Sequence, residues 1–168
     1  YEVLVRDGEE VQRDTPLLRA SAPTRDLLTA ERTALNLLCH LSGIATATRN
    51  WANQLAGTSA AVRDTRKTTP GLRKLEKYAV RCGGGQNHRM SLSDAALVKD
   101  NHIAAAGGVA AAFQAVRQHA PDITVEIEVD TLDQLREALG AGADLVLLDN
   151  MEPSVLREAV AIAQEHTA

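Results

Sequence analysis

The segment from residue 123 to residue 130, ITVEIEVD, decides the fold class of this 168-residue chain. Apolar and polar side chains alternate along it, and a period of two is typical of a β-strand. The aliphatic side chains then share one face, and Thr124, Glu126 and Glu128 share the other, which would be the lumen of a barrel. Because an uncompensated buried charge is costly, we expect cations or a metal close to these carboxylates.

Three further apolar segments have the length of strands, and helical stretches separate them. The segments are AAVRDT (60–65), ALVKD (96–100) and DLVLLDN (144–150). The stretches with helical spacing are 71–80, 108–119, 132–140 and 154–165. Strands that alternate with helices predict parallel pairing with crossover helices, and hence an α/β sheet or barrel.

Polar side chains gather where each of these strands ends. The strand ends carry Asp64-Thr65-Arg66-Lys67, Lys99-Asp100-Asn101, Glu128 with Asp130, and Asp149-Asn150. Open α/β sheets and barrels place their sites at the carboxyl ends of parallel strands. Cations opposite carboxylates suit a substrate with several negative charges, held together with a divalent metal.

Residues 1–20 follow a different pattern, with a turn at Asp7-Gly8 that predicts antiparallel strands. After Pro23, Thr24 is expected to cap a helix over residues 25–41, where apolar residues recur at three- and four-residue spacing.

Gly43 is expected to break this helix, and ATATRNWANQLAG (45–57) predicts a second one. We accordingly expect residues 1–41 to be the end of one domain with its linking helix. Residues 42–168 would form a second domain, part of an α/β barrel.

Half of the cations lie in under a quarter of the chain. The net charge is −4, yet residues 63–102 hold nine Lys or Arg against four Asp or Glu. A basic surface helix over 73–81 accounts for Arg73, Lys74, Lys77 and Arg81. Four of the remaining five cations lie at strand or loop ends and predict an anionic ligand: Arg66, Lys67, Arg89 and Lys99.

Composition excludes several functions. Four aromatic residues are too few for base stacking, so no nucleic-acid partner is expected. No apolar run approaches the roughly 18 residues of a membrane span, so no membrane partner is expected. Cys39 and Cys82 form no C-x-x-C motif and indicate a reducing, cytoplasmic location. Zinc, P-loop and catalytic-triad motifs are missing from the sequence.

Three motifs, taken together and in this order, resemble the quinolinate phosphoribosyltransferase family. They are DTRKTTPG (64–71), GGGQNHR (83–89) and VKDNH (98–102). The upstream ERTALNLLCHLSGIAT (31–46) and the downstream EIEVD and LLDN match the same family in order and spacing. The resemblance covers essentially the whole chain.

The resemblance implies a fold and a reaction. The fold would be an open α/β barrel of the type II phosphoribosyltransferases, with seven strands in the family, preceded by the last strands of an N-terminal α/β sandwich. The reaction would transfer the phosphoribosyl group of phosphoribosyl pyrophosphate to quinolinate with decarboxylation. The products would be nicotinate mononucleotide, pyrophosphate and carbon dioxide, with Mg²⁺ as cofactor, in NAD biosynthesis.

The resemblance also implies a cationic pocket for the two carboxylates of quinolinate. This pocket would consist of Arg66, His88, Arg89 and Lys99. Thr65 and Lys67 would line it, and Lys67 would reach toward phosphate. Arginine suits the role because its planar fork matches a carboxylate.

Two carboxylates, Glu128 and Asp149, would by the same resemblance face the ribose hydroxyls and the magnesium-bound pyrophosphate. The implied catalytic residues are Lys67, Lys99, Glu128 and Asp149. The enzyme would be a homodimer or larger, in which Arg32 reaches into the neighbouring subunit's site.

Other functions remain open. A paralogous phosphoribosyltransferase for another aromatic acid would tolerate the loss of one carboxylate-binding arginine. A Schiff-base barrel lyase would need only Lys99. As structural residues, Arg66 and Arg89 would instead pair with Glu126 or Glu128.

The family pattern extends beyond this chain at both ends. Most of the N-terminal sandwich, and later strands with the loops that hold the 5′-phosphate, are not in the sequence. A four-stranded arc of a barrel leaves open edges and an uncovered apolar face. We therefore expect these 168 residues to be an excerpt of a longer enzyme, and to be marginal or inactive alone.

Overall fold

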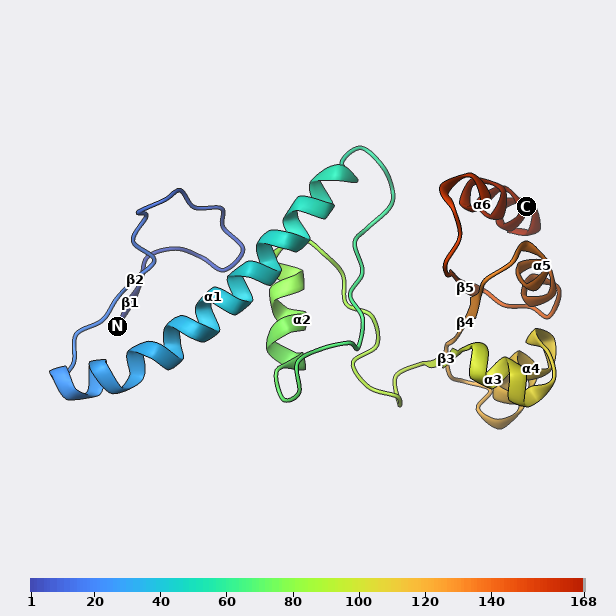
Figure 1. The fold of residues 1–168 in the computed structure, drawn as a ribbon, viewed down its shortest axis with the longest axis horizontal. Helices are drawn as coiled ribbons and strands as arrows, with labels where there is room; N and C mark the ends of the chain where they lie inside the picture. The colour runs from blue at the N-terminus through green and yellow to red at the C-terminus, as the bar shows by residue number, and fades with distance from the viewer. Residues whose placement is uncertain (168) are drawn as a thin grey trace. The chain divides into compact units, whose positions relative to one another are not determined.

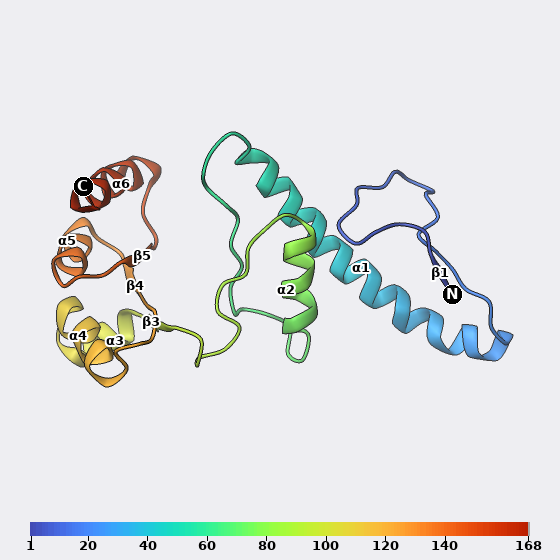
Figure 2. The same ribbon diagram turned by 180° about the vertical axis from the view of Figure 1, so that it is seen from behind.

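The structure is a computed structural model, and it describes residues 1–167. The chain divides into two compact units, Tyr1–Met90 and Ser91–Ala168. Figure 1 labels the helices and strands of each unit, and Figure 2 shows them from behind. The domain boundary expected at residues 41–42 is a different division of the chain, and it stays a prediction.

The second unit contains a three-stranded parallel sheet in the order β3-β4-β5. The strands are β3 (Ala96–Val98), β4 (Val125–Val129) and β5 (Leu145–Leu148). Val98 pairs with Ile127 and Val129 pairs with Leu148, so the carboxyl ends of the strands lie at one edge. These strands confirm the ones predicted at 96–100, 123–130 and 144–150, and each is slightly shorter than predicted.

Helices connect these strands and pack along the sheet. They are α3 (Asp100–Ala106), α4 (Val109–His119), α5 (Leu132–Gly140) and α6 (Pro153–Thr167). Both views show them along the same side of β3, β4 and β5 (Figures 1 and 2). The alternation of strand and helix confirms an α/β fold, and the helices predicted at 108–119, 132–140 and 154–165 are confirmed.

The apolar face of β4 forms the centre of the second unit's core. Ile127 and Val129 are both 0% exposed, and they belong to one cluster with Val98, Phe113 and Leu135. The alternation along ITVEIEVD therefore has the predicted effect, because it directs every second side chain into the helix-covered core.

The short helix α3 was not predicted, because its first residues were interpreted as polar groups that end a strand. The helix begins directly after Lys99, whose backbone N–H donates to Nδ1 of His102 at 2.9 Å. It ends at Gly107, which adopts a left-handed φ of 83°. Glycine is favoured there because it has no Cβ to clash in that conformation.

The first unit begins with a small antiparallel pair, β1 (Glu2–Val3) and β2 (Leu18–Arg19). This pair confirms the antiparallel pairing predicted for residues 1–20, although the strands are only two residues long. The helix α1 (Thr24–Gln54) follows. Its N-cap is Pro23, which makes no side-chain cap, so the prediction that Thr24 caps the helix is wrong.

The predicted break at Gly43 is also wrong, because α1 runs through it as one helix of 31 residues. A glycine inside a helix costs only about 1 kcal/mol relative to alanine. No proline accompanies Gly43, and α1 packs against a second helix, α2 (Arg73–Cys82). The packing of α1 on α2 therefore overrides the weak local preference for a break.

The segment at 60–65 does not form the predicted strand. The structure has one isolated parallel bridge, between Arg63 and Gln86. Gln86 N–H donates to the Val62 carbonyl at 2.8 Å, and Asp64 N–H donates to the Gln86 carbonyl at 3.1 Å. The partner segment is a loop, so the pairing does not extend beyond this bridge.

The glycine run before that loop has a packing role. A Cβ on Gly83 would collide with the Ala45 carbonyl and with Thr48, and one on Gly85 would lie 2.8 Å from the side chains of Thr48 and Val80. The run therefore lets the loop after α2 pass close to α1, which brings residues 86–89 beside the bridge.

Candidate functional site

The predicted site residues fall into two groups, one in each unit. The first, which we call the loop cluster, consists of Thr65, Arg66, Lys67, His88 and Arg89. The second, which we call the strand-end cluster, consists of Lys99, Glu128 and Asp149. Arg32 belongs to neither cluster, and it lies exposed on α1.

The Asp64 carboxylate brings together the two loops of the loop cluster. Oδ1 accepts the His88 backbone N–H at 2.7 Å, and Oδ2 accepts the Asn87 side-chain amide at 2.6 Å. Residues 65–67 follow Asp64 directly, and His88 and Arg89 follow Asn87. The cations that lie 22 residues apart in the chain, Lys67 and Arg89, are therefore carried by two loops that share one carboxylate.

Lys77 of α2 contacts both Asp64 and the loop that carries His88. Its side chain is 1% exposed, and Nζ lies 2.5 Å from Oδ1 of Asp64 and 2.9 Å from the His88 carbonyl. Asn87 also donates to the Lys77 carbonyl at 2.8 Å. The prediction that Lys77 lies on a basic surface helix is wrong, since a buried carboxylate partners its ammonium group.

Arg73 is the second cation of α2 that serves the loops. It donates from Nε to the Thr68 hydroxyl at 3.0 Å, and from its terminal nitrogens to the carbonyls of Met90 at 3.3 Å and Arg66 at 3.4 Å. The surface-helix prediction holds for Lys74 and Arg81, which are exposed. Half of the basic residues of this helix are therefore structural supports of the loops.

Glu76 lies between Arg73 and Lys77 on the same face of α2 and is buried. It accepts the Thr69 backbone N–H at 3.1 Å and contacts Nε2 of His40 at 2.8 Å. The hydrogen bond from Thr69 lowers the pKa of Glu76 below its ordinary value, and the bond to His40 adds to this effect against the cost of burial. His40 thereby ties α1 to the loop that follows Lys67.

Inside the loop, Thr65 shapes the backbone, because its hydroxyl accepts the Lys67 N–H at 3.0 Å. The Lys67 side chain is exposed, and Arg66 is half-buried. Nε of Arg66 is buried, and among residues 1–167 it has no hydrogen-bond acceptor. A buried N–H without an acceptor is costly, so an anionic oxygen from outside the described chain suits this position.

The strand-end cluster is held by the parallel register. Lys99 follows β3, and its Nζ donates to Oε2 of Glu128 on β4 at 2.9 Å. Asp149 follows β5, and its N–H donates to the Val129 carbonyl at 3.0 Å, which continues the β4-β5 pairing. The three side chains thus come from the carboxyl ends of three adjacent strands.

The charge of Lys99 is stabilised by its acidic neighbours. The hydrogen bond to Glu128 raises the pKa of Lys99; partial burial opposes this shift, and the charges of Glu128, Asp100 and Asp149 support it. A lysine that forms a Schiff base must be neutral to attack a carbonyl, and its pKa is then lowered. The raised pKa of Lys99 therefore gives no support to the lyase alternative.

Asn150 ends the cluster with a left-handed backbone, φ 53°. Its side-chain amide donates to Oδ2 of Asp149 at 3.0 Å. Asparagine tolerates this conformation better than most residues, and here it also orients the neighbouring carboxylate. Sequence reasoning had grouped Asn150 with the polar strand end without giving it a role.

The fit of the strand-end cluster to a metal ion depends on what else binds there. Among residues 1–167 no group of three or more His, Cys, Asp or Glu side chains is placed to hold a metal ion. Mg²⁺ is commonly bound by one or two carboxylates together with substrate phosphates. Glu128 and Asp149 would therefore hold Mg²⁺ only together with ligands from outside the described chain, because by themselves they form no protein cage.

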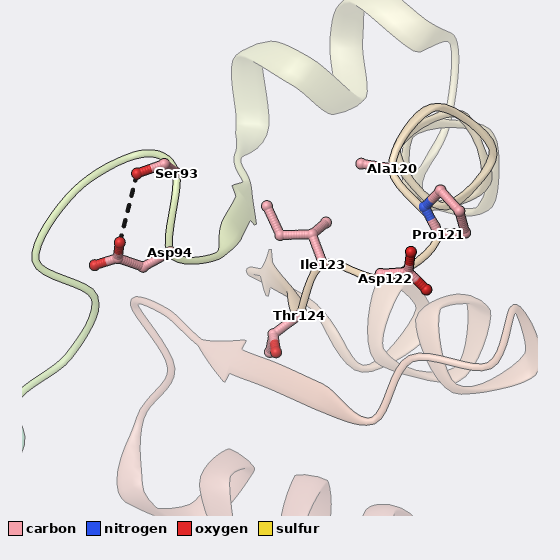
Figure 3. A pocket seen from close by; sticks show the side chains of 7 residues that line it. All are labelled: Ser93, Asp94, Ala120, Pro121, Asp122, Ile123 and Thr124. Atoms are coloured by element: carbon pink, nitrogen blue, oxygen red, sulfur yellow. Dashed lines mark hydrogen bonds between the residues drawn. The ribbon is translucent and has the colours of Figure 1, made fainter.

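A cavity of about 470 Å³ lies at the opposite end of the second unit's strands. Figure 3 shows its lining residues, with Ser93 donating to Asp94, and Ile123 and Thr124 just before β4. None of the predicted site residues lines it. Sites in α/β folds lie at the carboxyl ends of strands, so we do not assign the site to this cavity.

Sequence reasoning missed the residues that hold the two loops of the loop cluster together. They are Asp64, whose carboxylate accepts three of the hydrogen bonds, and Arg73, Lys77 and Asn87. A signal for them existed. Arg73, Glu76 and Lys77 recur at the spacing of one helix face, and a face with three charges beside two loops rich in polar groups indicates internal pairing.

The fold defines the class of the chain: an α/β protein with charged side chains at the carboxyl ends of parallel strands. Family models identify it further. The C-terminal domain of quinolinate phosphoribosyl transferase matches residues 44–168, and the N-terminal domain matches residues 1–42. The chain belongs to the quinolinate phosphoribosyltransferase family.

Relatives in several organisms are similar to the chain. The nicotinate-nucleotide pyrophosphorylase [carboxylating] of Mycobacterium leprae is 57% identical over 152 residues, 89% of this chain and 54% of that protein. The probable enzyme of the same name from Bacillus subtilis is 47% identical over 153 residues, 90% of this chain and 53% of that protein. The chain spans about half the length of the curated relatives it matches.

Solved structures are similar in fold. The nicotinate-nucleotide pyrophosphorylase of Ehrlichia chaffeensis has a TM-score of 0.95 at 41% identity, covering 98% of this chain and 60% of that one. NadC from Streptococcus pyogenes has a TM-score of 0.90 at 46% identity, covering 96% and 57%. None of the helices within residues 1–167 combines the length and the apolar character that a membrane span requires.

Proposed function

We propose that the protein carrying this chain transfers the phosphoribosyl group of phosphoribosyl pyrophosphate to quinolinate with decarboxylation. The products are nicotinate mononucleotide, pyrophosphate and carbon dioxide. The names of the relatives support this reaction. The observation that carries it is Arg66, whose buried Nε has no acceptor in the described chain and sits on a loop beside His88 and Arg89.

The loop cluster suits the dicarboxylate. Arg66 and Arg89 offer planar forks that bind carboxylates in a fixed orientation, and His88 adds a further polar contact. Thr65 keeps the loop in shape through its bond to Lys67 N–H, which leaves the exposed Lys67 side chain free to meet a phosphate. Two carboxylates on one aromatic ring match two arginines better than one carboxylate would.

The strand-end cluster suits the phosphoribosyl substrate. Breaking the bond at the anomeric carbon develops positive charge on the ribose, and nearby carboxylates such as Glu128 and Asp149 stabilise it. Lys99 is held protonated by Glu128, so it presents a cation to a substrate carboxylate or to the departing pyrophosphate. Bound Mg²⁺ would share the charge of that pyrophosphate.

Three finer statements belong to this proposal. The barrel has seven strands, of which β3, β4 and β5 form part. The protein is a homodimer or larger, in which Arg32 acts in trans; exposed Leu28, Leu35 and Leu38 beside it on α1 support an interface. It works in the cytoplasm, where the exposed free thiol of Cys39 stays reduced.

The test is calorimetric titration of the full-length protein with quinolinate and with nicotinate, which has one carboxylate. Quinolinate should bind about tenfold or more tightly than nicotinate, because each charge-assisted contact contributes about 1.5–3 kcal/mol. Arg66→Gln should abolish this preference, and the control Arg81→Gln, an exposed arginine of α2, should keep it.

Equal binding of the two acids would favour the second candidate, a paralogous enzyme for another aromatic acid. Removing Mg²⁺ with a chelator tests the roles of the two clusters separately. It should stop product formation from phosphoribosyl pyrophosphate and leave quinolinate binding unchanged, since the loop cluster contains no metal ligand in the proposal. Loss of quinolinate binding on chelation would contradict the assignment of Mg²⁺ to the second substrate.

A further inference from the structure

We propose that Lys77, with Asp64 and Asn87, is a positioning device that holds the two loops of the loop cluster at the spacing that the substrate dianion requires. This inference rests on the proposed function, because it concerns the same pocket. None of the three residues is proposed to touch substrate. They act through the backbone of His88 and through the segment that begins at Thr65.

The contacts of Lys77 join both loops from inside the protein. Its ammonium group contacts Asp64, which precedes the first loop, and the carbonyl of His88, which lies on the second. The side chain is 1% exposed, so water cannot replace either contact. A fully buried ammonium between two loops fixes their separation, because its two acceptors cannot move apart without leaving a buried charge unpaired.

The Asp64 carboxylate supplies the matching acceptor side. It is 8% exposed and accepts from Lys77, from the Asn87 amide and from the His88 backbone N–H. Asn87 uses its second amide hydrogen on the Lys77 carbonyl. These hydrogen bonds join three segments: α2, the segment that begins at Asp64, and the loop with Asn87 and His88. The segments are therefore held together by side chains and not by β-sheet pairing.

Apolar packing does not fix the separation of the two loops in the first unit. Ala79 is the one buried apolar side chain among the residues described there, whereas Glu76 and Lys77 are both buried. The pairing of the loop segments is one isolated bridge. Two loops held so weakly by backbone and core would sample many separations, and ordering them on binding would weaken affinity for the substrate.

The other charged residues of the same helix face hold the first loop further along. Arg73 binds the Thr68 hydroxyl, and Glu76 accepts the Thr69 N–H. Glu76 and Lys77 each lie about one helical turn after Arg73, so a single face of α2 contacts the loop both before and after Arg66. Of these three residues, Lys77 alone contacts both Asp64 and His88.

The experiment compares Lys77→Met with Lys74→Met in the full-length protein. The two positions lie on the same helix, and Lys74 is exposed. Steady-state KM for quinolinate, KM for phosphoribosyl pyrophosphate and kcat are measured for each. Lys77→Met should raise the KM for quinolinate about tenfold or more and change the KM for phosphoribosyl pyrophosphate about threefold at most. The strand-end cluster keeps its geometry, and Lys67, the one loop-cluster cation proposed to meet a phosphate, has an exposed side chain that can follow its ligand.

A partly conservative variant and a milder one keep the test decisive if Lys77→Met does not fold. Lys77→Gln retains an N–H donor and should recover part of the quinolinate affinity. Asn87→Ala leaves the ion pair in place and removes two amide bonds, so it should fold and still weaken quinolinate binding. Hydrogen exchange at the His88 amide, which needs no substrate, should speed up in Asn87→Ala and not in Lys74→Met.

The outcomes separate this inference from the proposed function. Wild-type protein that binds and converts no quinolinate would overturn the proposed function and this inference with it. Wild-type activity on quinolinate, together with folded Lys77 or Asn87 variants whose KM for quinolinate stays within about twofold, would overturn the inference alone. Equal losses for both substrates would also overturn it, because they indicate a general structural role.

Discussion

The two units of this chain hold their charged residues in place by different means. In the second unit, β3, β4 and β5 are paired in parallel, and an apolar cluster around Ile127 and Val129 lies beneath them. In the first unit, one bridge and a buried ionic network around Lys77 do the same for the loop cluster. The backbone hydrogen bonds of a sheet fix the positions of the strand ends, whereas the two loops depend on specific side-chain contacts.

The difference predicts how each unit responds to substitution. An apolar core tolerates changes of similar volume, because the forces are non-directional. A buried ion pair does not tolerate the loss of one partner, because the other charge stays behind without compensation. The following predictions test this contrast, beginning with the largest effect.

Asp64→Ala should destabilise the first unit by about 3–5 kcal/mol, because it leaves the Lys77 ammonium buried and unpaired. The matched control is Asp133→Ala, which removes one of the two acidic partners of Arg136 from an exposed pair on α5. That change should be close to neutral, as exposed ion pairs generally are. Hydrogen exchange resolved by segment measures both, and a small effect of Asp64→Ala would remove the contrast between the units.

Ile127→Ala should destabilise the second unit by about 2–5 kcal/mol, because it leaves a cavity in the centre of the core. Ile127→Val should cost only about 0.5–1.5 kcal/mol, since it removes one methylene. Denaturant unfolding gives both values. A cost of Ile127→Val as large as that of Ile127→Ala would mean that this core is as specific as the ionic network.

Glu76→Gln should lower stability at neutral pH and make it less dependent on pH in acid. The pKa of Glu76 is lowered in the folded state from its ordinary value of 4.5. Its ionised form therefore stabilises the fold above that value, and this contribution is lost as the pH falls through the folded-state pKa. Melting temperatures of wild type and Glu76→Gln should converge as the pH falls below 4.5. Parallel curves at all pH values would contradict the role given to Glu76.

Borohydride reduction with a carbonyl compound should label Lys99 no more than the exposed Lys74 at neutral pH. Glu128 raises the pKa of Lys99, so a smaller fraction of its amine is neutral and able to attack a carbonyl. The contribution of this charge to stability is present below the unfolded pKa and is lost as the pH rises through the raised one. Mass spectrometry compares the adducts at the two lysines, and selective labelling of Lys99 would restore the lyase alternative.

The elements of the second unit were predictable because their signals are local. The alternation in ITVEIEVD and the helical spacing at 132–140 each lie within a single element, and β4 and α5 confirm them. Two of the failures in the first unit share one cause. Whether Gly43 breaks a helix, and whether residues 60–65 form a strand, depends on what packs against them from elsewhere in the chain.

The candidate site shows the same division. The types of residue in the loop cluster and the strand-end cluster, and their location after apolar segments, were visible in the sequence. The supports were not, because a lysine on a polar helix has the same local pattern whether it is solvated or buried. Lys77 is buried because Asp64, 13 residues before it, and His88, 11 residues after it, come to the same point.

The sequence by itself determined the α/β class, the strand ends that carry the charges, and the family, since these depend on short-range periodicity and on motifs of fixed spacing. The tertiary structure decided which cations are paired inside the protein, as Lys77 is, and which stay exposed, as Lys67 does. That choice depends on burial and on partners distant in the chain. The free energy of a charge is set by its surroundings, and residue type alone does not specify them.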